Sequence, residues 1–137
     1  MAFGTLAFDT LQTSDSKKTG TSQTLDTSYV YNGTAKAWAF YQQYTSNLIN
    51  DSLNASGITD NAAGDATIAY TNNMSAAGKY ATTTSGANGH VLASDAGRDD
   101  AATTSALTTS MRLQHASVGA TAQDGNHNSI AIFGDLA

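Results

Sequence analysis

Hydrophobic and polar side chains alternate along several short stretches of the chain. Ile68 and Tyr70, for example, fall on one face of their stretch, and threonine and alanine side chains fall on the other. A period of two over four to eight residues, bounded by Gly, Asn and Asp, predicts β-strands. We therefore expect a hairpin over 56–72 with a tight turn near Gly64. The stretches with this pattern are 67–71, 80–84, 107–114 and 128–133.

Residues 29–44, YVYNGTAKAWAFYQQY, hold six of the eleven aromatic side chains. Tyr29 and Tyr31 share one face of a predicted strand, and the following Asn-Gly pair is a strong hairpin turn signal. Trp38 and Phe40 share a face of the next strand. Because large aliphatic side chains are few, we expect these rings to build the core and the subunit contacts. A sugar-stacking platform is the alternative. The stretch after them, 46–61, places Leu48, Ile49, Leu53 and Ile58 among many turn-forming residues.

The N-terminal part differs from the rest in composition. Residues 3–12 place Leu6 and Phe8 on one face of a short predicted strand, whereas residues 13–28 are almost wholly polar. A polar stretch of this kind predicts a loop or an extended arm outside the core. We therefore divide the chain into an N-terminal arm, residues 1–28, and a body, residues 29–137.

Residues 85–105 are rich in Gly, Asn and Asp, and only Val91 and Leu92 interrupt them, which predicts a long exposed loop. Its clustered carboxylates raise the possibility of calcium, but they lack the ligand spacing of an EF-hand loop, and an arginine lies among them. A solvated loop with a local Arg–Asp pair is therefore favoured. The side chains predicted as an exposed recognition surface are Asn88, His90, Asp95, Arg98, Asp99 and Asp100.

The spacing of strands and turns, with no amphipathic helical period between them, predicts an all-β protein: an antiparallel β-sandwich or small barrel with an extended N-terminal arm. Leu, Ile, Val and Phe together number only 21 of 137 residues, so the core is thin. A thin core in a small chain favours subunits that complete it for one another. We expect a homo-oligomer, with a trimer preferred. The predicted subunit or shell contacts are Phe3, Leu6, Phe8, Leu11, Tyr29, Tyr31, Trp38 and Phe40.

Charge and chemistry exclude several classes of function. The net charge is −5 and the six basic residues are scattered, which argues against a nucleic-acid partner. No secretory signal and no apolar stretch of membrane-spanning length is evident, so membrane insertion is not expected. There is no cysteine, and no nucleophile elbow, phosphate-binding loop or paired histidine spacing occurs. We expect no enzymatic activity, no cofactor and no metal. One alternative stays open: a single histidine per chain gathered on a trimer axis.

Four segments resemble small virion proteins and tail-fibre modules of tailed phages, especially marine ones. They are LAFDTLQTSDSKKTG, AKAWAFY, DSLNASGITDNAAGDATIAYTNNMSAAGKY and SIAIFGDLA, and together they span nearly the whole chain. Ala66 departs from the pattern, which usually has an aromatic residue there. The matching positions are Asp9, Thr10, Gln12, Trp38, Asp51, Asp60, Asn61, Gly64, Asp65, Met74, Tyr80, Gly134 and Asp135.

This resemblance implies a non-enzymatic structural protein of the virion, made in the host cytoplasm and assembled on the particle exterior. The preferred role is capsid decoration, as a cement or head-fibre protein bound to the major capsid protein in many copies. The first alternative is a tail-fibre or tail-tip protein that binds a host receptor, with a host-surface glycan as a possible partner. The second alternative is a free carbohydrate-binding module.

Overall fold

The structure is a computed structural model that describes residues 10–12, 24–86, 90–94, 106–117, 119 and 121–137. The contacts divide the chain after Thr34 into two compact units, Met1–Thr34 and Ala35–Ala137, and each is described by itself. The division therefore lies further along the chain than the predicted one after Ser28.

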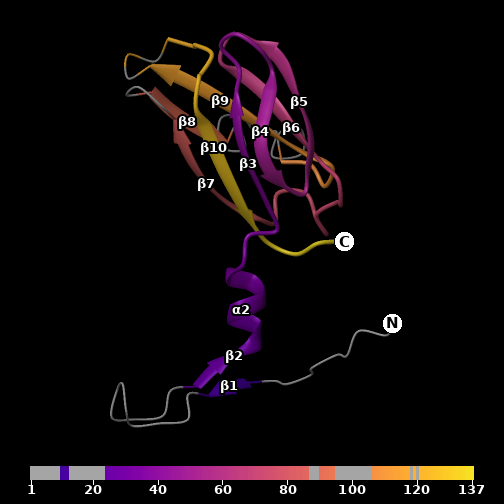
Figure 1. Cartoon of the computed structure of the whole chain (residues 1–137). Helices are drawn as coiled ribbons and strands as arrows, with labels where there is room; N and C mark the ends of the chain where they lie inside the picture. The colour runs from indigo at the N-terminus through magenta and orange to yellow at the C-terminus, as the bar shows by residue number, and fades with distance from the viewer. Residues whose placement is uncertain (1–9, 13–23, 87–89, 95–105, 118, 120) are drawn as a thin grey trace. The chain divides into compact units, whose positions relative to one another are not determined.

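The N-terminal unit contains two short strands and one helix. β1 (Thr10–Gln12) pairs antiparallel with β2 (Thr24–Asp26), and α2 (Thr27–Gly33) follows directly (Figure 1). The Asp26 carboxylate accepts a hydrogen bond of 2.7 Å from the Ser28 backbone N–H, which caps the first turn of the helix. The end of the predicted polar loop is therefore a strand, because 24–26 finds a pairing partner in β1.

The prediction of a strand at Tyr29 and Tyr31 was wrong, since both residues lie in α2. Their two-residue spacing indicated a strand, but the cap at Asp26 starts a helix instead. At the other end, the Thr34 hydroxyl donates a hydrogen bond of 2.6 Å to the Val30 carbonyl. The Asn-Gly pair consequently ends a helix and does not form a hairpin turn. This helix also explains why the N-terminal unit extends to Thr34.

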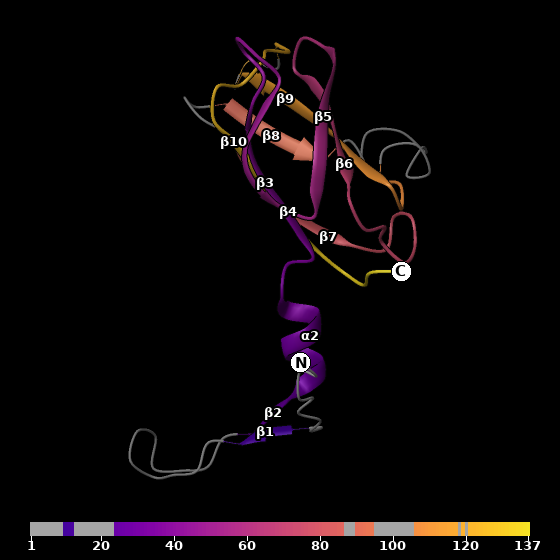
Figure 2. The same cartoon turned by 45° about the vertical axis from the view of Figure 1, so that its right-hand side comes forward.

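The body contains two four-stranded antiparallel sheets, which confirms the mainly β prediction. The first sheet has the order β4-β3-β10-β7, so the first and last strands of the body, β3 and β10, lie side by side (Figures 1 and 2). The bounds are β3 (Ala37–Gln42), β4 (Leu48–Leu53), β7 (Ala81–Gly86) and β10 (Asn128–Phe133). The turn-rich composition of the stretch 46–61 gave no indication of β4, which pairs with β3.

The second sheet has the order β5-β6-β9-β8. Its first two strands form the predicted hairpin, with Gly64 at the turn at a φ of 70°. The bounds are β5 (Ala55–Ala62), β6 (Asp65–Tyr70), β8 (His90–Ser94) and β9 (Ser110–Ser117). β8 corrects the prediction of a long loop over 85–105, because Val91 and Leu92, the two residues that interrupt its polar pattern, belong to a strand that pairs with β9.

One hydrophobic core cluster takes side chains from both sheets of the body. Alternation along β6 buries Ile68 and Tyr70 as predicted, and β9 and β10 bury every second residue in the same way. Tyr41 is fully buried on β3, whereas its neighbours Trp38 and Phe40 face outward. The core therefore uses one ring of the aromatic stretch on β3 and leaves the other two at the surface. Its members are Ala37, Ala39, Tyr41, Ala66, Ile68, Tyr70, Met74, Ala106, Met111, Leu113, Ile130 and Ile132.

Candidate functional site

The outer side of the first sheet carries large apolar side chains, which we call the apolar face: Trp38, Phe40, Leu48 and Leu53. Trp38 lies opposite Leu53 in the register of β3 and β4. The register shifts between Phe40 and Tyr41, so that Phe40 pairs with Asp51 but Tyr41 pairs with Ile49. Because side chains alternate across a strand, this β-bulge turns Leu48 to the same side as Leu53.

The apolar face is open to solvent in the single chain. Leu53 is 49 % exposed, Leu48 is 48 % exposed and Phe40 is 37 % exposed, while Trp38 is partly buried. The Phe40 ring stacks on His127 with 5.8 Å between ring centroids. Exposed apolar patches of this kind mark surfaces that contact other macromolecules. The bulge therefore places Leu48 on the exposed face with Leu53, while Ile49 packs against the core.

The N-terminal helix also exposes apolar side chains. None of its residues is buried, and Tyr29 is 72 % exposed. A seven-residue helix is too short to be stable on its own in water, so its order depends on contacts outside the helix. Of the other predicted contact residues, Leu11 lies in β1, whereas Phe3, Leu6 and Phe8 fall outside the described residues.

The outer side of the second sheet has a different character, because it holds an ion pair. Arg112 on β9 donates a hydrogen bond of 2.9 Å from Nε to Oδ1 of Asp65 on β6, and a second one from a terminal guanidinium nitrogen to Oδ2. Asp65 is buried, whereas the arginine side chain is 41 % exposed. The hydrogen bonds from Arg112 hold the pKa of the Asp65 carboxyl below its ordinary value, although burial opposes this shift.

This pair predicts an acid-sensitive contribution to stability. A carboxyl whose pKa is lowered by folding stabilises the protein above its unfolded pKa, and this stabilisation is lost as the pH falls through the folded pKa. We expect Asp65→Asn to lower the free energy of unfolding at pH 7, because it removes the ion pair. The loss should be only about 1 kcal/mol, because solvent screens the half-exposed partner, Arg112. At pH 2 the difference from the wild type should shrink. Chemical denaturation at both pH values measures it.

A double-mutant cycle with Arg112→Met gives the control for this prediction. The coupling free energy between Asp65 and Arg112 should be favourable at pH 7 and should approach zero at pH 2. A coupling that does not change between the two pH values would contradict the assignment of the acid sensitivity to this pair.

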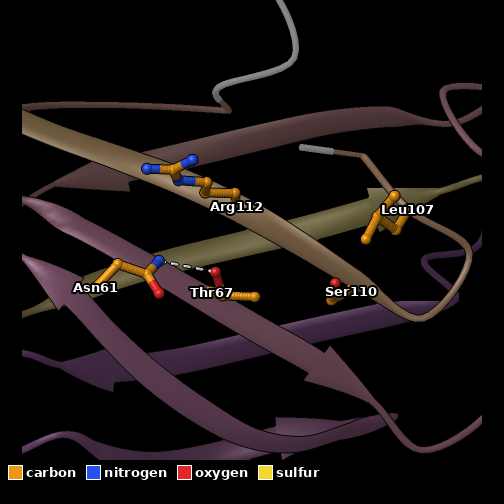
Figure 3. A pocket seen from close by; sticks show the side chains of 5 residues that line it. All are labelled: Asn61, Thr67, Leu107, Ser110 and Arg112. Carbon is orange, nitrogen blue, oxygen red and sulfur yellow. Dashed lines mark hydrogen bonds between the residues drawn. The ribbon is translucent and has the colours of Figure 1, made fainter. Parts of the chain in front are cut away.

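A pocket of about 330 Å³ lies beside the ion pair on the same outer side (Figure 3). Its walls come from β5, β6 and β9 and from the segment that leads into β9, and they present polar side chains and one leucine. The Asn61 amide nitrogen donates a hydrogen bond of 2.9 Å to the Thr67 hydroxyl, as the dashed line in Figure 3 shows. The lining residues are Asn61, Thr67, Leu107, Ser110 and Arg112.

The sequence did not identify this pocket. The alternating stretch 67–71 places Thr67 on one side of its strand, and the stretch 107–114 places Ser110 and Arg112 together on one side of theirs, as the two strands have them in the structure. The pairing of β6 with β9 brings the two sets together, with Thr67 opposite Arg112. A single sequence does not report which strands pair. It therefore indicated the polar side of each strand separately, but not the pocket that the two sides form together.

Most of the predicted recognition loop lies outside the described residues. This applies to Asn88, Asp95, Arg98, Asp99 and Asp100, while His90 begins β8 opposite Ser117. Within the described residues no group of three or more histidine or acidic side chains is placed to hold a metal ion. In the same part of the chain, no helix has the length and hydropathy needed to cross a membrane.

Compared with protein-family models, curated proteins and solved structures, the chain gives no match. A function for the protein is therefore inferred from its own surfaces and from the sequence segments quoted above.

Proposed function

We propose that the protein is a non-enzymatic structural component of a tailed-phage virion, exposed on the particle surface and bound to the assembled capsid in many copies. The observation that carries this proposal is the apolar face, where Leu48 and Leu53 are about half exposed on one side of an antiparallel sheet. An exposed apolar patch indicates that the protein contacts other subunits through this surface. The resemblance of the four sequence segments to phage virion proteins supports the same role.

The proposed architecture is a β-sandwich body with an N-terminal arm, assembled as a homotrimer. A core cluster shared by the two sheets supports the sandwich, because sandwiches pack the inner sides of two sheets together. The exposed side chains of α2 support an arm that becomes covered on assembly. The apolar face is the proposed contact between copies or with the shell. In this role, many copies of one small chain would occupy equivalent positions on a symmetric shell.

The test is the number of copies per particle, measured by quantitative mass spectrometry against the major capsid protein. Capsid decoration predicts a count on the order of hundreds, set by the repeated lattice of the shell. About a dozen copies or fewer would contradict the capsid role and move the protein to the tail, where receptor binding is the alternative function. Absence from purified particles would overturn both roles.

Two variants make the experiment specific to the apolar face. Leu53→Asp places a charge on this face, opposite Trp38, and we expect it to lower the copy number at least about tenfold, because burying an unpaired carboxylate in a contact is costly. Thr71→Asp adds the same charge at an exposed position directly after β6 and should leave the copy number unchanged. Equal incorporation of the two variants would exclude the apolar face as the contact.

A further inference from the structure

We propose that the pocket beside the Arg112–Asp65 pair binds one monosaccharide unit of an uncharged surface glycan. This site differs from the recognition loop that the sequence predicted, and it does not depend on the proposed place of the protein in a virion. Its walls belong to three neighbouring strands of one sheet, together with Leu107 (Figure 3). Sites on strands hold their side chains more rigidly than sites on loops.

The charge of the pocket favours a neutral ligand. Among the described residues that line the pocket, Arg112 is the cation, and the Asp65 carboxylate neutralises it through the paired hydrogen bonds. An anionic ligand would have to compete with a buried carboxylate for the same guanidinium group. A sugar hydroxyl makes no such demand, because it can accept from and donate to neutral side chains without displacing the aspartate.

The hydrogen-bonding groups of the pocket are mixed in type. The Asn61 amide nitrogen is already used twice, toward Asp65 at 3.0 Å and toward Thr67 at 2.9 Å, which fixes the orientation of the amide. Within the described part of the chain, its carbonyl oxygen has no hydrogen-bond partner, and neither does the Ser110 hydroxyl. The Thr67 hydroxyl accepts from Asn61 and retains its own proton to donate.

A pocket that offers both hydrogen-bond acceptors and donors matches a ligand rich in groups that can donate and accept. Sugar hydroxyls have this property, whereas phosphate and carboxylate only accept. Leu107 supplies an apolar contact for the C–H side of the ring. The volume of about 330 Å³ lies at the lower end of the range for small-molecule sites, which suits one sugar ring rather than an oligosaccharide.

The test is a titration of the full chain with the methyl glycosides of glucose, galactose, mannose and N-acetylglucosamine, and with sodium glucuronate, followed by amide NMR chemical shifts. We expect saturable shifts at Thr67, Ser110 and Arg112 with at least one neutral sugar. The dissociation constant should be on the order of 1 mM or weaker, since the described lining residues include no aromatic ring and make few contacts with one small ligand.

The decisive variant is Thr67→Ala with Ser110→Ala, which removes two hydroxyls from the pocket and leaves the ion pair in place. We expect it to weaken sugar binding at least about tenfold, because several hydrogen bonds to the ligand are lost together. The matched control is Thr83→Ala with Ser129→Ala, which removes the same groups from strands of the first sheet. This control should bind within about twofold of the wild type, and thermal unfolding verifies that both variants are folded.

Three results would overturn the proposal. They are the absence of saturable shifts with all four neutral sugars, saturable shifts confined to residues away from the pocket, and undiminished binding by the folded Thr67→Ala, Ser110→Ala variant. A response to glucuronate without a response to any neutral sugar falls under the first of these results and excludes an uncharged ligand.

Discussion

Gly64→Ala is expected to lower the free energy of unfolding by about 4 kcal/mol, which is a large share of the stability of a small domain. Two independent effects contribute to this loss. The φ of Gly64 is 70°, a left-handed conformation that costs an ordinary residue roughly 1–2 kcal/mol. A Cβ built there would also lie 2.2 Å from the His115 carbonyl oxygen and 2.7 Å from the Gln123 backbone nitrogen.

Neither neighbour can move aside cheaply, because both atoms belong to the backbone. The Gly64 carbonyl accepts a hydrogen bond of 2.7 Å from the His115 N–H, and the Gly64 N–H donates one of 2.7 Å to the Asp124 carboxylate. The turn of the hairpin is therefore attached to β9 and to the segment before β10. A shift that made room for a methyl group would break bonds on both sides.

Gly57→Ala is the matched control, because a Cβ added at Gly57 meets no atom within 4 Å. It should change the free energy of unfolding by less than about 1 kcal/mol. Thermal unfolding followed by circular dichroism measures both variants, and Gly64→Ala should melt roughly 15 °C or more below the wild type. If the two variants melt together, the close approach of the turn to β9 does not exist in solution.

Leu113→Ala is expected to cost about 3 kcal/mol, in the range for deleting most of a buried leucine side chain. Leu113 is 1 % exposed on β9 and belongs to the core cluster shared by the two sheets. This core has few large aliphatic side chains. Removing one of them therefore deletes a large fraction of the buried apolar contacts of the core. Urea unfolding gives the effect as a shift of the midpoint at constant slope.

Leu53→Ala removes the same atoms from the apolar face, where the side chain is 49 % exposed. At concentrations where the chain is monomeric, the variant should lose less than about 1 kcal/mol. At higher concentrations its loss should grow if copies associate through this face, because association stabilises only the folded wild type. A loss at high dilution that equals that of Leu113→Ala would show that Leu53 is not a surface residue.

The elements with a clean alternation were predictable from the sequence. The hairpin around Gly64 and the alternating strands that became β9 and β10 follow from side-chain patterns of period two, which depend only on local geometry. Elements without such a pattern were missed. β4 was read as a turn-rich stretch because its bulge interrupts the alternation, and β8 was read as loop because polar residues surround Val91 and Leu92.

The helix α2 shows a second kind of error. Two tyrosines spaced by one residue fit a strand and also fit one turn of a helix, so the local pattern is ambiguous. A single capping interaction at Asp26 distinguishes the two. The spacing of the aromatic side chains reports neither this cap nor the outside contacts on which so short a helix depends.

The sequence by itself determined the class of secondary structure, the main hairpin and its turn, and which side chains of β6, β9 and β10 face the core. It determined these features because each one depends on neighbours within a few positions. The candidate sites were decided only by the tertiary structure. The pocket requires β6 to pair with β9, and the apolar face requires a bulge that sets the register of β4 against β3. Both depend on contacts between distant segments, whose pairing free energies are not encoded in any local pattern.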